Sequence, residues 1–323
     1  MPWLLRRTLD AVLMTLLGVA VLFVLVRAMP GDPLTAILGE RSVDPATTVA
    51  LRARFGLDTP LPTALAAFLR DAVRGDLGLS IATQRPVTAL LGERLGPTLL
   101  LGALTLLVNF GVGVALGLWG ALHPTTRRAR LLSTVTVVGY ALPTFVVGVL
   151  LVWLGAVHLG WFPAGGLADP LLAADADTVT VLRDRLRHLA LPLATMVLAT
   201  IAVPLAQQRS AALETARAPW VRAARARGVA PARVAWRHVW RPALSPVITL
   251  LGLWLPMLVG GAVFVEAVFA WPGVGSLLAT ATAQRDLPVV IGGGALIIAL
   301  VQAGGLLTDC AHRATDPRRR RDP

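Results

Sequence analysis

Residues 207–246 read QQRSAALETARAPWVRAARARGVAPARVAWRHVWRPALSP, and a long apolar run lies on each side of them. The stretch carries eight arginines but only one acidic residue, Glu214. Alanine and arginine favour helix formation, and short arginine-rich loops between apolar segments are typical of the cytoplasmic side of a membrane protein. The stretch therefore predicts a membrane-embedded helical chain whose basic loop docks a partner on the inner face.

The overall composition supports this prediction. Hydrophobic residues make up 55% of the 323 residues, and the mean hydropathy is +0.70. Several apolar runs approach the ~20 residues that a helix needs to cross a bilayer, and a segment in lipid must satisfy its own backbone hydrogen bonds. We therefore expect an all-α membrane protein. Six transmembrane helices are predicted, at about 9–29, 99–122, 131–157, 189–206, 247–269 and 289–307.

Six spans place both termini on the same side of the membrane. Most short arginine-rich segments fall on that side, which the positive-inside rule identifies as cytoplasmic, although three arginines at 183–187 disagree locally. The apolar run after Arg6 and Arg7 is long for a signal peptide, so we expect it to remain as the first span. The predicted domains are a first transmembrane helix at 1–30, a small helical extracytoplasmic subdomain at 31–97, a core of five transmembrane helices at 98–310 with the basic loop at 208–246, and a basic cytoplasmic tail at 311–323.

The composition also excludes several kinds of chemistry. A single cysteine, Cys310, excludes an intrachain disulfide framework. The chain has no lysine and so cannot form a P-loop, which means that any ATP and Mg²⁺ would bind on another polypeptide. The net charge of +12 would suit nucleic acid, but the arginines gather at span edges, where topology explains them. We expect membrane lipid around the chain, no nucleic-acid partner, and no metal or cofactor bound by this chain.

The basic loop has the signals of two helices joined by a turn. The first helix is expected over 211–227, and Gly228 suits the left-handed position that ends a helix. Pro231 suits the first turn of a second helix, which is expected over about 232–240. Small side chains allow a partner to approach closely, and exposed arginines can pair with its carboxylates. The candidate docking residues are Glu214, Ala223, Ala224, Arg225, Ala226, Arg227, Gly228 and His238.

A second interpretation of the loop stays open. An amphipathic helix with a basic face also binds anionic lipid, and Trp220, Trp236 and Trp240 would then anchor it at the interface.

Short motifs recur along nearly the whole chain. They are PGDP at 30–33, GLDTPL at 56–61, GDLGLS at 75–80, LPTF at 142–145, ARARG at 224–228, VEAVFAWPGVG at 265–275, RDLP at 285–288 and DPR at 316–318. In this order they resemble the permeases of binding-protein-dependent ABC importers, and the similarity is closest to the dipeptide, oligopeptide and nickel branch. The ARARG motif, followed by His238, resembles the coupling loop of that family.

The resemblance implies a type I ABC importer permease fold and a non-catalytic subunit of the cell inner membrane. It further implies a second homologous permease, two ATPase subunits that bind ATP and Mg²⁺ and dock on the coupling loops, and an extracytoplasmic solute-binding protein. The solute would be a peptide or a nickel chelate. The predicted spans contain no cluster of metal-ligating residues that would favour nickel.

Six residues within or beside the spans are candidates for the pathway or its gate: Glu266, Asn109, Pro143, Trp271, Pro272 and Gly273. A carboxylate in an apolar span is a functional candidate, although Glu266 also suits a structural bond to the turn that follows it. Asn109 suits a hydrogen bond between helices, and glycine and proline within spans suit either close packing or a hinge.

Two other functions are weaker. An ion-driven secondary transporter needs ionisable residues deep in several spans, and this sequence has few. A membrane-embedded enzyme needs paired catalytic groups, whereas the histidines fall at span edges and in loops.

Overall fold

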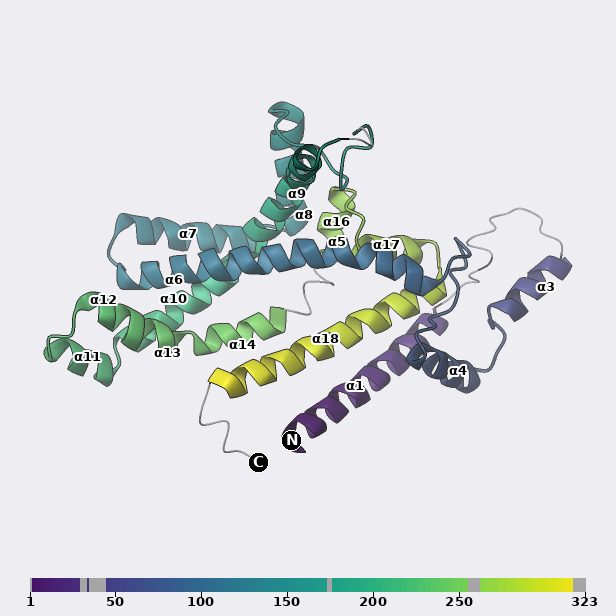
Figure 1. Ribbon diagram of the computed structural model, residues 1–323, viewed down its shortest axis with the longest axis horizontal. Helices are drawn as coiled ribbons and strands as arrows, with labels where there is room; N and C mark the ends of the chain where they lie inside the picture. The colour runs from purple at the N-terminus through teal and green to yellow at the C-terminus, as the bar shows by residue number, and fades with distance from the viewer. Residues whose placement is uncertain (1, 30–33, 35–44, 173–175, 255–261, 316–323) are drawn as a thin grey trace. The chain divides into compact units, whose positions relative to one another are not determined.

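The computed structural model describes residues 2–29, 34, 45–172, 176–254 and 262–315 (Figure 1). Their regular structure is helical, with one isolated β-bridge between Leu79 and Pro86 in the described part of the chain. The residues form two compact units. The first is built mainly from Met1–Thr98 and Pro272–Leu306, and the second contains Leu99–Trp271 and Leu307–Asp322. The all-α class is confirmed, while the predicted division into domains stays a prediction.

The first unit holds two apolar helices side by side. A Cβ built at Gly294 would lie 2.3 Å from a methyl group of Leu22, so the two backbones approach closely at that point. Phe23 and Ile291 are buried in the same cluster, and the ring of Phe68 lies 5.6 Å from that of Phe23. The helices of this unit are α1 (Pro2–Arg27), α3 (Pro45–Arg54), α4 (Leu61–Val73), the beginning of α5 (Val87–Val108), α17 (Val274–Ala283) and most of α18 (Leu287–Thr315).

A buried aspartate connects two distant parts of the first unit. Asp286 is 2% exposed and lies in the turn between α17 and α18. Its carboxylate accepts hydrogen bonds from the Ser80 hydroxyl, from the Ile81 N–H at 3.0 Å and from the Ala82 N–H at 3.2 Å. The GDLGLS and RDLP motifs are therefore in direct contact, although 206 positions separate Ser80 from Asp286.

Replacing this aspartate tests the contact. Asp286→Ala leaves three donors without their acceptor, two of them buried, and we expect it to lower the stability of the first unit by more than about 2 kcal/mol. The measurement is the thermal midpoint of the purified chain in detergent. Asp58→Ala is the matched control because its side chain is 63% exposed and pairs with Arg52 at the surface. The control is expected to cost less than about 1 kcal/mol, and equal shifts for the two variants would contradict the role of Asp286.

The second unit contains the rest of α5 and most of the remaining helices. They are η1 (Asn109–Gly113), α6 (Val114–Leu122), α7 (Arg127–Ala141), α8 (Thr144–Leu151), η2 (Val152–His158), α9 (Thr178–Thr200), α10 (Ala202–Ala216), α11 (Pro219–Ala226), α12 (Pro231–Arg233), η3 (Val234–Trp240), α13 (Arg241–Ala243), α14 (Ser245–Trp254) and α16 (Val263–Val268). The segments labelled η are π-helical turns, which widen a helix locally.

Close packing of α6 against α10 dominates the second unit (Figure 1). A Cβ built at Gly117 would lie 2.5 Å from the carbonyl oxygen of Leu205, and one at Gly113 would lie 3.2 Å from Ile201. Glycine at these positions lets the two backbones approach to a distance that a larger residue would prevent. The packing interpretation is therefore confirmed at Gly113 and Gly117, whereas Gly111 has no neighbour within 4 Å of a built Cβ.

The described residues contain four helices that are long and apolar enough to cross a membrane: Trp3–Arg27, Val87–Leu122, Thr178–Ala216 and Leu287–Cys310. The second and third begin 11 or 12 residues before the apolar runs. These two helices therefore extend beyond their apolar parts into segments with charged residues, such as Glu93 and Arg94 in the second helix. The predicted span at 247–269 includes residues 255–261, which lie outside the described residues.

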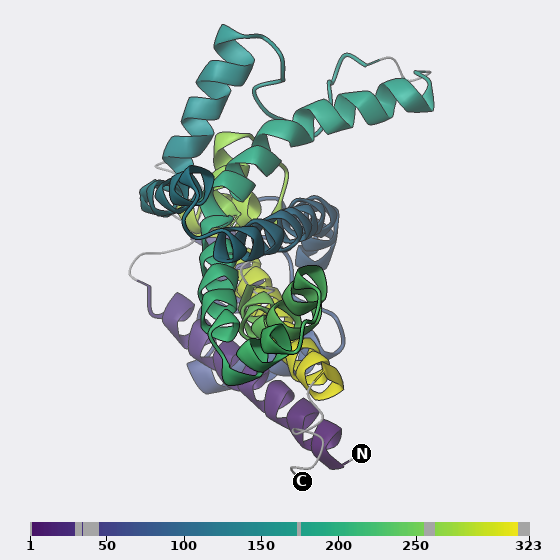
Figure 2. The same cartoon turned by 90° about the vertical axis from the view of Figure 1, so that its left-hand side faces the viewer.

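A further apolar segment is bent in its middle. The segments Arg127–Ala141 and Thr144–His158 meet at an angle of 102°, so that α8 turns away from α7 (Figure 2). Pro143 explains the break, because a proline disfavours the helical conformation of the residue before it. Leu142 accordingly has φ −83° and ψ 127°, which is extended. The predicted continuous span at 131–157 is therefore two helices. The structure supports four or five crossings among the described residues.

Candidate functional site

The basic loop between α10 and α14 begins with an interrupted helix. The expectation of one helix over 211–227 is wrong, because α10 ends at Ala216 and α11 begins at Pro219. Ala218 between them has φ −63° and ψ 147°, the extended conformation that a following proline favours. The high helix propensity of alanine and arginine is thus overridden by one proline.

Gly228 ends α11 in the predicted left-handed conformation, with φ +74°. Its N–H donates to the Arg225 carbonyl at 3.0 Å, and the Val229 N–H donates to the Ala224 carbonyl at 3.2 Å. These two bonds are the Schellman motif, which satisfies carbonyls left open at a helix end. A glycine adopts this backbone without the steric penalty that other residues meet. The prediction for Gly228 is confirmed.

One face of α11 is anchored inside the chain. Val221 and Ala224 are fully buried, and they share an apolar cluster with Ala212 of α10 and with Val234 and Val239 of η3. Ala224 therefore contributes to internal packing and is not available for a partner to contact. The helix is held in a fixed orientation relative to α10.

The opposite face of α11 and the turn after it are basic and open. Arg225 and Arg227 are exposed, and small exposed residues lie between and beside them. An exposed arginine presents several N–H donors in a fork that matches a carboxylate. The exposed residues of this surface are Trp220, Arg222, Ala223, Arg225, Ala226, Arg227 and Gly228; Glu214 on α10 is exposed and His238 is half-buried. We call these nine residues the arginine surface; the buried Ala224 is not part of it.

The second helical part of the loop starts as predicted and ends later. Pro231 occupies the first turn of α12, which confirms that prediction. The helix was expected to end near 240, but helical structure continues through η3, α13 and α14. The wide π-helical turn at η3 gives room to the ring of Pro242, which would otherwise clash with a carbonyl one turn earlier. Within η3 the rings of Trp236 and Trp240 lie 3.9 Å apart.

Two pathway candidates lie at the end of α16. Glu266 is fully buried and Trp271 is 1% exposed; Trp271 packs with Phe269 and Leu101 in an apolar cluster. The Trp271 N–H donates to the Glu266 carbonyl at 2.8 Å, while Ala270 between them has φ +47°. The backbone of Glu266 thus stabilises the turn that follows it. This bond favours the structural interpretation for the backbone but leaves the role of the carboxylate untested.

Of the other four pathway candidates, two lie elsewhere in the chain and two follow Trp271 directly. The side-chain amide of Asn109 donates to the Thr200 hydroxyl at 2.7 Å, so Asn109 links η1 to α9 as expected for a bond between helices. Pro143 is exposed at the break between α7 and α8. Pro272 and Gly273 precede α17 in the first unit. The chain itself therefore keeps four of the six close together, Glu266, Trp271, Pro272 and Gly273, whereas Asn109 and Pro143 lie elsewhere in the second unit.

Two further polar residues lie in the packed interface of α10, and sequence reasoning missed them. Gln208 is fully buried, with its Cβ 3.0 Å from the position of a Cβ at Gly117. Arg209 donates from Nη1 to the Ser133 hydroxyl on α7. The available signal was a polar Gln-Arg pair directly after an apolar run. Within the described residues no group of three or more His, Cys, Asp or Glu side chains is arranged to hold a metal ion.

Two family comparisons together span nearly the whole chain. Residues 113–321 match the binding-protein-dependent transport system inner membrane component, and residues 1–102 match the N-terminal part of such membrane components.

Individual relatives agree with this match. The chain is 38% identical over 316 residues to a putative peptide permease protein of Brucella ovis, with 97% of each chain covered. It is 36% identical to the di/tripeptide transport system permease protein DppB of Pseudomonas aeruginosa (97% of each chain) and 34% identical to the oligopeptide transport system permease protein AppB of Bacillus subtilis (98% of each chain). The chain belongs to the family of binding-protein-dependent transport system inner membrane components, the permeases of ABC importers.

Proposed function

We propose that this chain forms half of a transmembrane pathway for short peptides and that its arginine surface passes the movement of ATPase subunits to that pathway. Membership of the family makes the chain a non-catalytic, multi-pass inner-membrane subunit that works with ATPase and binding-protein partners. Peptide is the proposed solute because the relatives described above are named as peptide permeases. A nickel chelate remains the alternative solute.

The observation that supports the coupling role is the construction of the arginine surface. Its inner side is fixed by Val221 and Ala224, which are fully buried against α10 and η3. Its outer side presents Arg225 and Arg227 beside a rigid Schellman turn. A surface that is fixed to the membrane helices and open to a partner transmits force better than a mobile loop. The anionic-lipid interpretation explains the arginines but gives no reason for the fixed turn.

The finer arrangement belongs to the same proposal. We infer six spans, with both termini in the cytoplasm and an outer subdomain at 31–97, and an assembly with one homologous permease and two ATPase subunits. The arginines of the basic loop and of residues 127–130 support this orientation, since both would lie on the cytoplasmic side. An ion-driven secondary transporter is not supported, because the family couples transport to ATPase partners.

Reversing the charge of the arginine surface tests the proposal. In the double variant Arg225→Glu and Arg227→Glu, we expect the ATPase subunits recovered with the purified chain to fall at least about tenfold, because repulsion replaces pairing with carboxylates. ATP-driven uptake of a tripeptide into proteoliposomes should fall in parallel. The matched control reverses Arg183 and Arg185, which are exposed on the proposed outer side and should leave ATPase recovery unchanged. Normal recovery in the loop variant, or loss in the control, would refute the assignment of this surface.

A further inference from the structure

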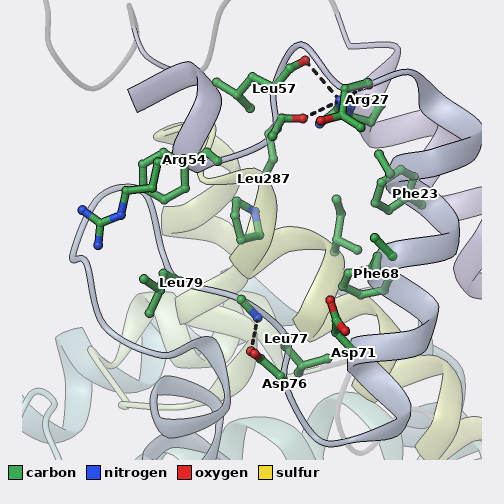
Figure 3. Close-up of a pocket in the computed structure, with 18 residues that line it drawn as sticks. Phe23, Arg27, Arg54, Leu57, Phe68, Asp71, Asp76, Leu77, Leu79 and Leu287 are labelled. Atoms are coloured by element: carbon green, nitrogen blue, oxygen red, sulfur yellow. Dashed lines mark hydrogen bonds between the residues drawn. The ribbon is translucent and has the colours of Figure 1, made fainter. Parts of the chain in front are cut away.

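The first unit contains a cavity of about 450 Å³ beside the end of α1 (Figure 3). It lies among α1, α4, the first turns of α18 and the turn at residues 76–79. Its volume falls within the range of about 300–1,000 Å³ that small-molecule sites occupy. All of its lining residues belong to the first unit, so its shape does not depend on how the two units are arranged.

The charged groups of this cavity lie at different ends. Figure 3 shows Arg27 at one end and the carboxylates of Asp71 and Asp76 at the other, while the guanidinium of Arg54 extends away from the centre. Phe23 and Phe68 lie between the two ends along one wall. The cavity thus offers a positive end, an apolar middle and a negative end.

The positive end keeps donors for an anion. Arg27 donates from Nη2 to the carbonyls of Gly56, Leu57 and Thr59, at 2.9–3.1 Å. These bonds hold the side chain in place, and its hydrogen bonds to the described residues all leave from that one nitrogen. A guanidinium has five N–H donors, so within the described part of the chain those on Nε and Nη1 are open to a carboxylate.

The negative end holds two carboxyl groups, Asp71 and Asp76. The Arg70 guanidinium, which is hydrogen-bonded to Asp71, holds the pKa of that carboxyl below its usual value. One oxygen of Asp76 accepts from the Gly78 N–H at 2.9 Å, which fixes the carboxylate in the turn. Asp71 already has a cationic partner, so Asp76 is the main acceptor for an ammonium group.

This distribution of charge distinguishes two kinds of ligand. A phospholipid carries all its charges in one headgroup and needs a long apolar channel beside it. A short peptide with free termini carries an ammonium at one end, a carboxylate at the other and side chains between them. The cavity has opposite charges at separate ends with aromatic rings between, which matches the peptide.

We propose that this cavity binds a short peptide with free termini, with the terminal ammonium at Asp76, the terminal carboxylate at Arg27 and an apolar side chain against Phe23 and Phe68. The inference rests on the proposed transport of peptides and adds a binding site on the permease itself. Such a site would select for free termini and an apolar central residue before the peptide enters the pathway.

Photo-crosslinking of the assembled transporter in lipid nanodiscs tests the site. The probe is the tripeptide Ala-X-Ala, in which X is a diazirine analogue of leucine, and mass spectrometry identifies the labelled residues. We expect label on α1, α4 and the first turns of α18, at Phe23, Phe68 or Ile291. The same probe with an acetylated N-terminus and an amidated C-terminus should label these helices at least about fivefold less, because both ion pairs are lost.

Two variants examine the negative end and the apolar wall separately. Asp76→Asn keeps the shape and the bond to Gly78 but loses the charge, and it should weaken labelling by the free peptide about fivefold without changing the residual labelling by the blocked peptide. Phe68→Ala should weaken labelling by both peptides. Glu93→Gln is the matched control, since Glu93 is an exposed acid of the same unit that pairs with Arg85 and does not line the cavity. Equal labelling by free and blocked probes, label confined to other helices, or displacement of the free probe by phosphatidylethanolamine alone would overturn the proposal.

The same preparation separates this inference from the proposed function. Uptake of the tripeptide is measured in proteoliposomes with the binding protein and ATP present. If the tripeptide is taken up but the label lies outside the cavity, the binding site is refuted while the proposed transport of peptides still holds. Absence of uptake for a panel of peptides would overturn the proposed solute class, and with it the cavity assignment.

Discussion

The variant Gly117→Ala is expected to leave little folded chain in the membrane. A Cβ at this position would lie 2.5 Å from the Leu205 carbonyl oxygen and 3.1 Å from the Arg209 backbone nitrogen. Both contacts are with backbone, so α10 as a whole would have to move away from α6. Overpacking of this kind costs about 1–3 kcal/mol or more, and α6 and α10 pack together more extensively than the other helix pairs of the second unit.

Membrane accumulation and the thermal midpoint in detergent measure the effect of Gly117→Ala. The control is Gly111→Ala, which makes the same substitution in the preceding π-helical segment, where a built Cβ has no neighbour within 4 Å. We expect the control to accumulate normally, since it adds a methyl group in open space. If the two variants behaved alike, the close approach of α6 and α10 would not be what stabilises the second unit.

Features set by neighbouring residues were predictable from the sequence. The left-handed Gly228, the start of α12 at Pro231 and the helical class each follow from local propensity and from the needs of a chain in lipid. The break before Pro219 was equally local, and the sequence contained its signal. The surrounding alanines and arginines favour a continuous helix, and Pro219 alone overrides them.

Other features arise from contacts between distant residues, which no local pattern reveals. Nothing in the GDLGLS motif indicates that Ser80 hydrogen-bonds to Asp286, 206 positions later. In the same way, a glycine within a span can serve packing or motion, and only the 2.5 Å approach of a built Cβ to the Leu205 carbonyl oxygen shows that Gly117 serves packing. Burial of Trp271 was likewise not predictable, because it shares an apolar cluster with Leu101 of α5 and Met196 of α9, which are distant in the sequence.

The charges of the cavity illustrate the same limit. Arg27 and Asp76 belong to different predicted segments, one at the end of the first span and one in a turn of the outer subdomain. Each has an ordinary explanation when it is considered alone. Only the packing of α4 between them shows that they lie at two ends of one cavity.

Gly228→Val is expected to abolish ATP-driven peptide uptake while the chain still inserts into the membrane. A Cβ at Gly228 has no neighbour within 4 Å, so the change introduces no clash, and its effect comes from the backbone. At φ +74° a β-branched residue is strained by about 1–2 kcal/mol, enough to break the bonds to the Arg225 and Ala224 carbonyls. The buried face at Val221 would persist, so the spans would remain folded while Arg225 and Arg227 lose their fixed orientation.

The matched control for this variant is Gly228→Asn. Asparagine is tolerated in the left-handed region and often replaces glycine at a helix end, so it adds bulk and polarity while keeping the backbone conformation. Uptake into proteoliposomes and recovery of the ATPase subunits are measured for both variants. We expect Asn to retain most uptake and Val to retain almost none, with equal amounts of both chains in the membrane. Because the site is open, loss of uptake in both variants would show that a partner contacts Gly228 itself, whereas normal uptake in both would refute any role of this turn in coupling.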